Sequence, residues 1–258
     1  METGCRRAIL FLLFSPLFGT GFAQTETPVK VDKPLKSYSH WYFGAEYGVP
    51  FLFGDFTSFS ADKTYVGSQF GGFAGYQVNS WIGIEASART GYTRMGAKSY
   101  AGDYLMNADG MTYYTNQDFN TWKYKDVFSK VHFTNIGLQM NLNVNNFFGP
   151  NRGNRRWTVL LSPAVYAQHF STALINKAEK TDKWNIGIGG DVSLRYKISR
   201  AFDVQLRTGI IWVNNNKMDG ISTLIKSKDH FMTSAGLSLI WKVGKKKEDN
   251  VLYASRRA

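Results

Sequence analysis

The sequence has almost no cysteine and only one long apolar run, and both shortages limit what the chain can be. Its single cysteine, Cys5, lies near the start of the chain, ahead of that run. A disulfide framework is therefore excluded, and stability has to come from a sizeable core or from closed backbone hydrogen bonding. Because Cys5 precedes the apolar run instead of ending it, an acylated lipoprotein cysteine is not expected.

The apolar run has the features of an export signal. A basic pair, the run itself and two small residues follow one another in this order: Arg6 and Arg7, then 9–14, then Gly21 and Ala23. This is the order of a secretory signal peptide, and cleavage would leave Gln24 as the first mature residue. The run is too short for a membrane-spanning helix, which needs about 20 residues. We predict that residues 1–23 are removed on export.

Acidic residues are also scarce, with 19 Asp and Glu against 31 Lys and Arg and a net charge of +12. Export argues against nucleic acid as the partner of this basic chain. The mean hydropathy of −0.28 is typical of a soluble protein. However, membrane barrel strands alternate lipid-facing and lumen-facing residues, so their hydropathy averages out. The 16% aromatic content and 25 glycines suit such a barrel.

Eight segments of the mature chain alternate apolar and polar residues with a period of two. In the clearest, residues 186–198, even positions are mostly apolar and odd positions are glycine or polar. This is the pattern of a strand with two unlike faces. Weaker or comparable patterns begin near Trp41, Phe70, Ile82, Ile136, Trp157, Val204 and Ala235. Pro163 interrupts one of them and predicts a bulge or a distorted strand.

Short and long connections alternate between these segments. Only 79–80 and 199–201 separate two of the pairs, whereas long connections are expected at the ranges 51–65, 94–129, 171–184 and 214–230. Such alternation is the topology of a barrel with one end in the periplasm and the other outside the cell. The 145–156 connection is longer than the other short ones, but its Asn, Gly and Arg residues still indicate a turn.

Alternation alone does not say which face lies inside. Export, aromatic strand ends and glycines on the polar face favour a membrane barrel with a polar interior. The aromatic residues are Trp41, Tyr42, Trp81, Tyr92, Trp157, Trp212 and Trp241. We therefore predict an all-β fold, an eight-stranded antiparallel up-and-down transmembrane β-barrel in the outer membrane of a Gram-negative bacterium. The alternative is a soluble periplasmic sandwich or lipocalin-like barrel.

The chain resembles the OmpA-like family of eight-stranded outer-membrane barrels, in the variety without a peptidoglycan-binding domain. The resemblance covers about residues 39–243 and depends on the strand pattern and on glycine–aromatic runs at 40–48, 71–76 and 187–192. It implies a periplasmic N-terminal segment at 24–38, the barrel at 39–243 and a basic periplasmic tail at 244–258. The chain departs from the family in continuing beyond Trp241 with basic residues.

Charged residues fall on the polar face of several segments and predict a charge network inside the barrel. They are Glu46, Glu85, Arg89, Asp191, Arg195, Lys197, Arg207 and Lys242. An eight-stranded barrel is just wide enough to be filled by its own side chains. Buried charges need partners, so we expect salt bridges that plug the lumen. The alternative function of these residues is an ion path or gate.

His169 and Ser171 lie on one face of their segment, with Glu179 in the following connection. The His-x-Ser spacing resembles that of the outer-membrane lipid A deacylases, which use a lipid-facing Ser/His pair. The spacing to Glu179 does not match well, so we do not expect an enzyme. His40, His132 and His230 are scattered without an acidic cluster, and neither a metal nor another cofactor is expected.

Two further groups of residues lie in the connections. Basic residues gather at the expected periplasmic end and predict a positive collar, or else a contact with anionic lipid headgroups or cell-wall polymer; they are Arg152, Arg155, Arg156, Arg200, Lys242, Lys245, Lys246 and Lys247. Candidate contact residues in the longest connection are Tyr100, Tyr104, Tyr113, Tyr114, Trp122 and Tyr124. Tyr-rich and Asn-rich loops supply adaptable binding surface.

The expected function is a non-enzymatic one, in envelope integrity or surface interaction through long extracellular loops. Expected partners are outer-membrane lipid and lipopolysaccharide, and an extracellular or envelope protein. The alternatives are a small pore or transport component, or a lipid A-modifying hydrolase.

Overall fold

The structure is a computed structural model that describes residues 38–54, 56–60, 63–97, 128–148, 155–174, 180–214, 218, 230–244 and 249–253. The chain divides into two compact units, Met1–Leu35 and Lys36–Ala258, and all described residues belong to the second.

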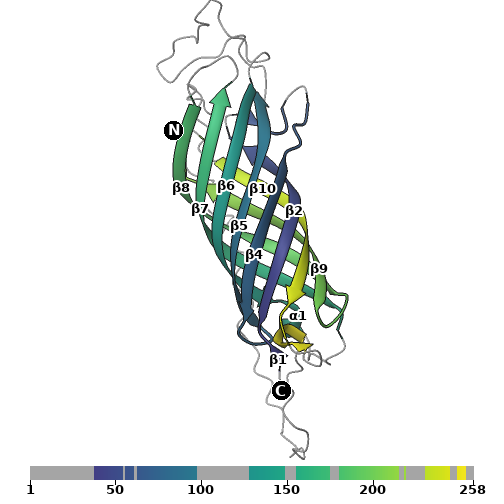
Figure 1. Cartoon of the computed structure of the whole chain (residues 1–258). Helices are drawn as coiled ribbons and strands as arrows, with labels where there is room; N and C mark the ends of the chain where they lie inside the picture. Colours follow the sequence, from purple (N-terminus) through teal and green to yellow (C-terminus); the bar gives the residue numbers. More distant parts are fainter. Residues whose placement is uncertain are drawn as a thin grey trace, which may run out of the picture. The chain divides into compact units, whose positions relative to one another are not determined.

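The second unit is a closed antiparallel barrel (Figure 1). Its long strands are β2 (Trp41–Phe53), β4 (Ser68–Gln77), β5 (Ile82–Ala97), β6 (Phe128–Asn143), β7 (Trp157–Leu174), β8 (Lys180–Lys197), β9 (Phe202–Val213) and β10 (His230–Lys242). Each pairs with the next along the chain, and β10 pairs back with β2 from Phe231↔Phe53 to Lys242↔Tyr42. The eight-stranded antiparallel prediction is confirmed.

The apolar face of each strand points outward. Along β6 and β7 buried and exposed positions alternate almost without interruption. The exposed positions include Ile136, Ile186, Ile188, Leu206 and Leu237, all more than half exposed. Charged and amide side chains occupy the buried positions. A soluble barrel would have the opposite arrangement, whereas a lipid-facing apolar band around a polar interior is that of a transmembrane barrel.

Several strands extend further than the sequence pattern indicated. The prediction that 171–184 form a long connection is wrong, because β7 continues to Leu174 and β8 begins at Lys180. In this region the outward residues become polar, so the apolar face that marks a lipid-facing strand ends before the strand does. β4 is shorter than its neighbours, and the short strand β3 (Phe56–Thr57) pairs with both β2 and β5 beyond its end.

Pro163 interrupts one ladder without inserting a residue. The β6–β7 pairing passes from Gln139↔Ala164 directly to Leu142↔Leu161, so equal numbers of residues lie on both strands. Proline has no N–H to donate to the neighbouring strand. The sequence thus located the irregularity, which is a local loss of pairing and not a bulge.

The end of the barrel with the short turns also holds the first and last described segments, Tyr38–Ser39 (β1 in Figure 1) and 249–253. Here β1 (Tyr38–Ser39) pairs in parallel with β11 (Asp249–Asn250), and a 3-10 turn, η2 (Val251–Tyr253), follows. A single helical turn, α1 (Asn145–Phe148), begins the 145–156 connection. No helix among the described residues is long and apolar enough to cross a membrane.

Candidate functional site in the barrel lumen

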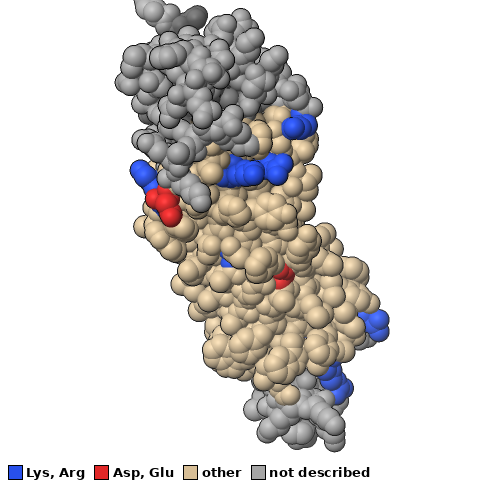
Figure 2. Space-filling model, turned by 45° about the horizontal axis from the view of Figure 1, so that its top comes forward, with Lys and Arg blue, Asp and Glu red and all other residues tan. Residues whose placement is uncertain are grey.

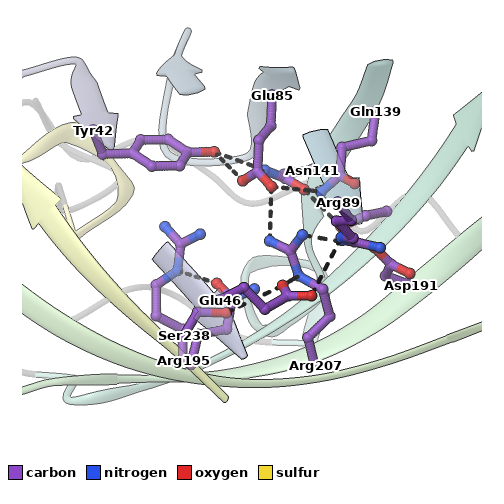
Figure 3. Close-up of polar contacts among 12 residues, drawn as sticks. Tyr42, Glu46, Glu85, Arg89, Gln139, Asn141, Asp191, Arg195, Arg207 and Ser238 are labelled. Carbon is purple, nitrogen blue, oxygen red and sulfur yellow. Dashed lines mark hydrogen bonds and ion pairs between the residues drawn. The ribbon is translucent and has the colours of Figure 1, made fainter. Parts of the chain in front are cut away.

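The lumen contains two separate charged clusters. We call the first the central cluster; it holds Glu46, Glu85, Arg89, Asp191, Arg195 and Arg207 (Figure 3). The second lies at the end predicted to face the periplasm and is called the periplasmic cluster; it holds Asp203, Lys242 and Tyr253, with Lys197 beside them. The eight residues predicted from the sequence are thus divided between two places, six in the first and two in the second.

Glu85 is the most extensively bonded carboxylate of the central cluster. Its Oε1 accepts hydrogen bonds from Arg207 Nη2 at 2.7 Å and Gln139 Nε2 at 2.9 Å. Its Oε2 accepts from Tyr42 Oη at 2.9 Å and Asn141 Nδ2 at 3.1 Å. Glu85 is fully buried. A buried carboxylate is tolerated when its charge is paired and its lone pairs are satisfied, and both conditions hold here.

Two arginines connect the remaining carboxylates across the lumen. Arg89 lies 3.2 Å from Glu46 Oε1 through Nε and 3.1 Å from Asp191 Oδ2 through Nη2. Arg207 lies 3.5 Å from Glu46 through Nε, in addition to its bond with Glu85. Their strands, β2, β5, β8 and β9, are not all neighbours in the ring, so these pairs span the interior.

Arg195 completes the central cluster by a different kind of contact. Its Nε donates to Gln205 Oε1 at 2.8 Å, and its guanidinium lies 4.9 Å from the centre of the Tyr42 ring. The cluster therefore contains three carboxylates and three guanidinium groups, all of them buried. This balance means that the middle of the lumen carries no net formal charge that would attract one sign of ion.

The periplasmic cluster closes the end of the lumen with residues from the C-terminal segment. Lys242 Nζ lies 2.5 Å from Asp203 Oδ1, and Tyr253 Oη donates to Asp203 Oδ2 at 2.8 Å. The Tyr253 ring also lies below two ammonium groups, at 4.6 Å from Lys197 and 4.8 Å from Lys242. Leu252 packs with Leu160 of β7 in the same place. The basic tail predicted at 244–258 is therefore docked into the barrel end over Asn250–Tyr253.

An apolar layer fills the opposite end of the lumen. It contains Leu52, Phe56, Met95, Val131, Phe133, Phe170, Leu174, Val213, Met218 and Met232, all buried. Met218 belongs to the β9–β10 connection, and its carbonyl accepts a 2.6 Å hydrogen bond from Thr172. Described side chains thus occupy the lumen at three levels. The level at the end with the long connections is apolar, the middle level is charged, and the level at the periplasmic end contains both apolar and charged side chains.

Glycines on the inner face make room for this packing. A Cβ on Gly209 would overlap with Asp191 Oδ1, and one on Gly75 would overlap with the Tyr42 ring. Each glycine therefore lets a side chain from a neighbouring strand cross its backbone at close range. This supports the interpretation that glycines on the polar face indicate a crowded interior.

Several residues of both clusters were not singled out from the sequence. Gln139, Asn141 and Asp203 lie on the polar face of their segments, so the alternation itself carried the signal. Tyr42 was grouped with the interfacial aromatic residues, which is wrong: it is fully buried in the lumen on the same face as Glu46. Tyr253 had no local signal because its contacts are with strands distant in sequence.

Some predicted residues lie outside the described part of the chain. These are the loop residues Tyr100, Tyr104, Tyr113, Tyr114, Trp122 and Tyr124, together with Glu179, Arg152, Lys245, Lys246 and Lys247. Within the described ranges, no group of three or more His, Cys, Asp or Glu side chains could hold a metal ion.

The closed ring, the apolar exterior and the filled polar interior define an eight-stranded transmembrane β-barrel. No family model matches the sequence, and no curated protein matches it.

Solved barrels resemble the structure at low sequence identity. Neisserial surface protein A is 11% identical, with 79% of this chain and 97% of that chain covered and a TM-score of 0.43. Ail, the attachment invasion locus protein of Yersinia pestis, is 10% identical, with 80% and 100% covered and a TM-score of 0.44. A major outer membrane protein of Thermus thermophilus is 12% identical, with 79% and 99% covered and a TM-score of 0.42. The likeness concerns the fold alone.

Proposed function

We propose that the protein is a non-conducting membrane scaffold that contributes to envelope integrity or surface interaction through its extracellular loops. The observation that carries this proposal is the filling of the lumen at three levels, with the three carboxylates of the central cluster paired with Arg89 and Arg207. An ion crossing this barrel would have to displace buried salt bridges, and breaking such a pair is strongly destabilising. The working surface is then the exterior and the loops.

Conductance tests this proposal directly. The mature protein is refolded, its heat-shifted gel band confirms folding, and single channels are recorded in a planar bilayer. We expect a folded barrel without conductance steps. Regular steps would show an open interior, and the pore alternative would then replace the scaffold.

The loop surface is tested by a deletion that the strand bounds now define. β5 ends at Ala97 and β6 begins at Phe128, so residues 98–127 can be replaced by a short Gly-rich turn. We expect the barrel to fold and any cell-surface or protein binding of the parent to be lost. Retained binding would exclude this loop as the contact surface. A loop replacement at 175–179 is the matched control.

A second candidate function, a lipid ester hydrolase, is favoured by one observation on the outer face. His169 Nε2 contacts Asp182 Oδ1, and Asp182 is the cross-strand neighbour of Ser171. Asp182, and not Glu179, is therefore the candidate for the carboxylate that orients His169 in a Ser/His/acid triad. Ser171 Oγ would attack the ester carbonyl and pass its proton to His169, and the alcohol would leave with that proton before water releases the acid. No hydrogen bond joins Ser171 to His169 among the described residues.

The hydrolase candidate has its own test. Ser171→Ala, His169→Ala and Asp182→Asn are compared with the parent by mass spectrometry of the lipids after incubation with the folded protein. Hydrolysis predicts loss of acyl chains with the parent and not with Ser171→Ala, while Thr134→Ala, a neighbouring outward residue, retains activity. Identical lipid masses with and without the parent protein would eliminate this candidate.

A further inference from the structure

The outer face of β5–β8 changes from apolar to polar in ordered cross-strand rows. Ala88, Ile136, Ala167 and Ile186 form an apolar row. The next rows toward the extracellular end are Thr90, Thr134, His169 and Trp184, and then Tyr92, His132, Ser171 and Asp182. Aromatic and polar residues of this kind mark the boundary between hydrocarbon and headgroups in membrane barrels.

The row beyond this boundary begins with two cations placed directly opposite each other. Arg94 of β5 pairs with Lys130 of β6, both side chains point outward, and both are exposed. Opposite residues in an antiparallel pair have Cβ atoms only about 5 Å apart, and like charges there are destabilising. Among the ion pairs of the described residues, none involves Arg94 or Lys130.

The surrounding surface supports an anionic ligand that comes from the membrane. Basic side chains lie near both ends of the barrel, with an acidic side chain beside some of them at the upper end, whereas the wall between the two ends is almost free of charge (Figure 2). The Arg94 guanidinium lies 5.8 Å from the Phe128 ring centre, and His132 lies on the same face as Lys130, one row nearer to the hydrocarbon. The next strand presents only the small side chain of Ala173 beside Lys130. Both cations are attached to strands of the closed ring, which limits their separation.

We propose that Arg94 and Lys130 bind the phosphate group of a phosphorylated lipid in the outer leaflet. A phosphate between the two cations removes their mutual repulsion and accepts charge-assisted hydrogen bonds from both. The acyl chains of the same lipid lie along the apolar rows below. This inference names the lipid partner of the scaffold proposed above and a site for it.

The test uses the full mature barrel folded in detergent, with bisphosphorylated lipid A as the probe and its phosphate-free form as the comparison. Retained lipid is measured by native mass spectrometry. We expect Arg94→Gln/Lys130→Gln to reduce retention of the phosphorylated form about tenfold, because each cation near an anionic lipid contributes favourably. Arg156→Gln/Arg200→Gln removes the same charge from the basic collar predicted at the opposite end, and reduced retention in this variant would assign the lipid to that collar instead. The conservative Arg94→Lys/Lys130→Arg variant should also bind.

Several outcomes would overturn the site. These are parent-level retention by Arg94→Gln/Lys130→Gln, equal retention of the phosphate-free lipid, or loss of binding in the opposite-end control. Inorganic phosphate is added as a competitor: displacement of the lipid at low phosphate concentration would identify a free anion as the ligand and reject the lipid. Conductance steps would defeat the scaffold proposal without changing these retention results, so the two failures are distinguishable.

Discussion

The central and periplasmic clusters use the same chemistry but differ in how they are held. Each contains at least one buried carboxylate, two or more cations and a tyrosine hydroxyl that donates to a carboxylate. In the central cluster every partner belongs to a strand of the closed ring. In the periplasmic cluster Tyr253 comes from a segment attached through the two residue pairs of β1 and β11. The central cluster is therefore held entirely by the strands of the barrel wall, whereas the periplasmic cluster also depends on a docked C-terminal segment.

This difference predicts different responses to the same loss. A side chain on the ring cannot leave the lumen unless strand pairing breaks, so a lost partner leaves a buried charge uncompensated. The C-terminal segment can undock and expose the remaining charges to water, which limits the penalty. Such locally opening segments have lower stability than the core of a fold.

The largest effect is expected for Glu85→Ala. This change removes the acceptor of Arg207, Gln139, Asn141 and Tyr42 at once. Breaking a buried ion pair typically costs about 3–5 kcal/mol, and we expect the free energy of unfolding to fall by that amount. Urea unfolding in lipid vesicles, followed by tryptophan fluorescence, measures it.

A double variant, Glu85→Gln/Arg207→Gln, should lose less stability than the sum of the losses of the two single variants, because the partners are coupled. Additive losses would contradict a shared network.

Asp203→Asn is expected to have a smaller effect, although Asp203 is as deeply buried as Glu85. It weakens the Lys242 pair and the Tyr253 hydrogen bond, and hydrogen bonds to charged groups contribute about 1.5–3 kcal/mol. Lys242 Nζ still donates to the Ser199 carbonyl at 2.9 Å. We expect a loss of about 2 kcal/mol or less, with the tail becoming sensitive to limited proteolysis. A loss as large as that of Glu85→Ala, with a protected tail, would show that both clusters are equally rigid.

The periodicity of the sequence accounts for the ring and for most of the central cluster. Alternation assigned Glu46, Glu85, Arg89, Asp191, Arg195 and Arg207 to one face, and closure of an eight-stranded ring brings that face together. Alternation could not show which carboxylate meets which arginine, because this depends on strand stagger and on the glycines that admit large side chains. It also placed strand ends too early where the outward residues become polar.

The periplasmic closure was less accessible to sequence reasoning. Asp203 lies on the polar face of its strand, but its partner Tyr253 follows a connection whose length and composition resemble a free basic tail. Only the three-dimensional structure brings Tyr253 to Asp203, 50 residues away in sequence. A local pattern carries no information about such a contact.

The same chemical change, removal of one tyrosine hydroxyl, can be made in each cluster, so the two losses of stability can be compared directly. Tyr42→Phe deprives Glu85 of a donor and Asn141 of a 2.7 Å acceptor inside the ring. Tyr253→Phe deprives only Asp203 of a donor. We expect about 2 kcal/mol for the first and about 1 kcal/mol for the second in urea unfolding. Equal effects would mean that docking of the tail is as constrained as the ring.

Deletion of residues 249–258 should have the smallest effect of all, because we expect the truncated barrel to remain non-conducting. The truncated barrel loses the Tyr253 hydrogen bond and the Leu252–Leu160 contact, and Lys242 and Asp203 become accessible from the periplasm. The central cluster and the apolar layer remain, so single-channel recordings should stay silent. Proteolysis-resistant folding of the truncated barrel is the control. Conductance steps that appear only after truncation would mean that the salt bridges of the central cluster admit ions. The docked tail, and not the ring, would then be the barrier that keeps the membrane sealed.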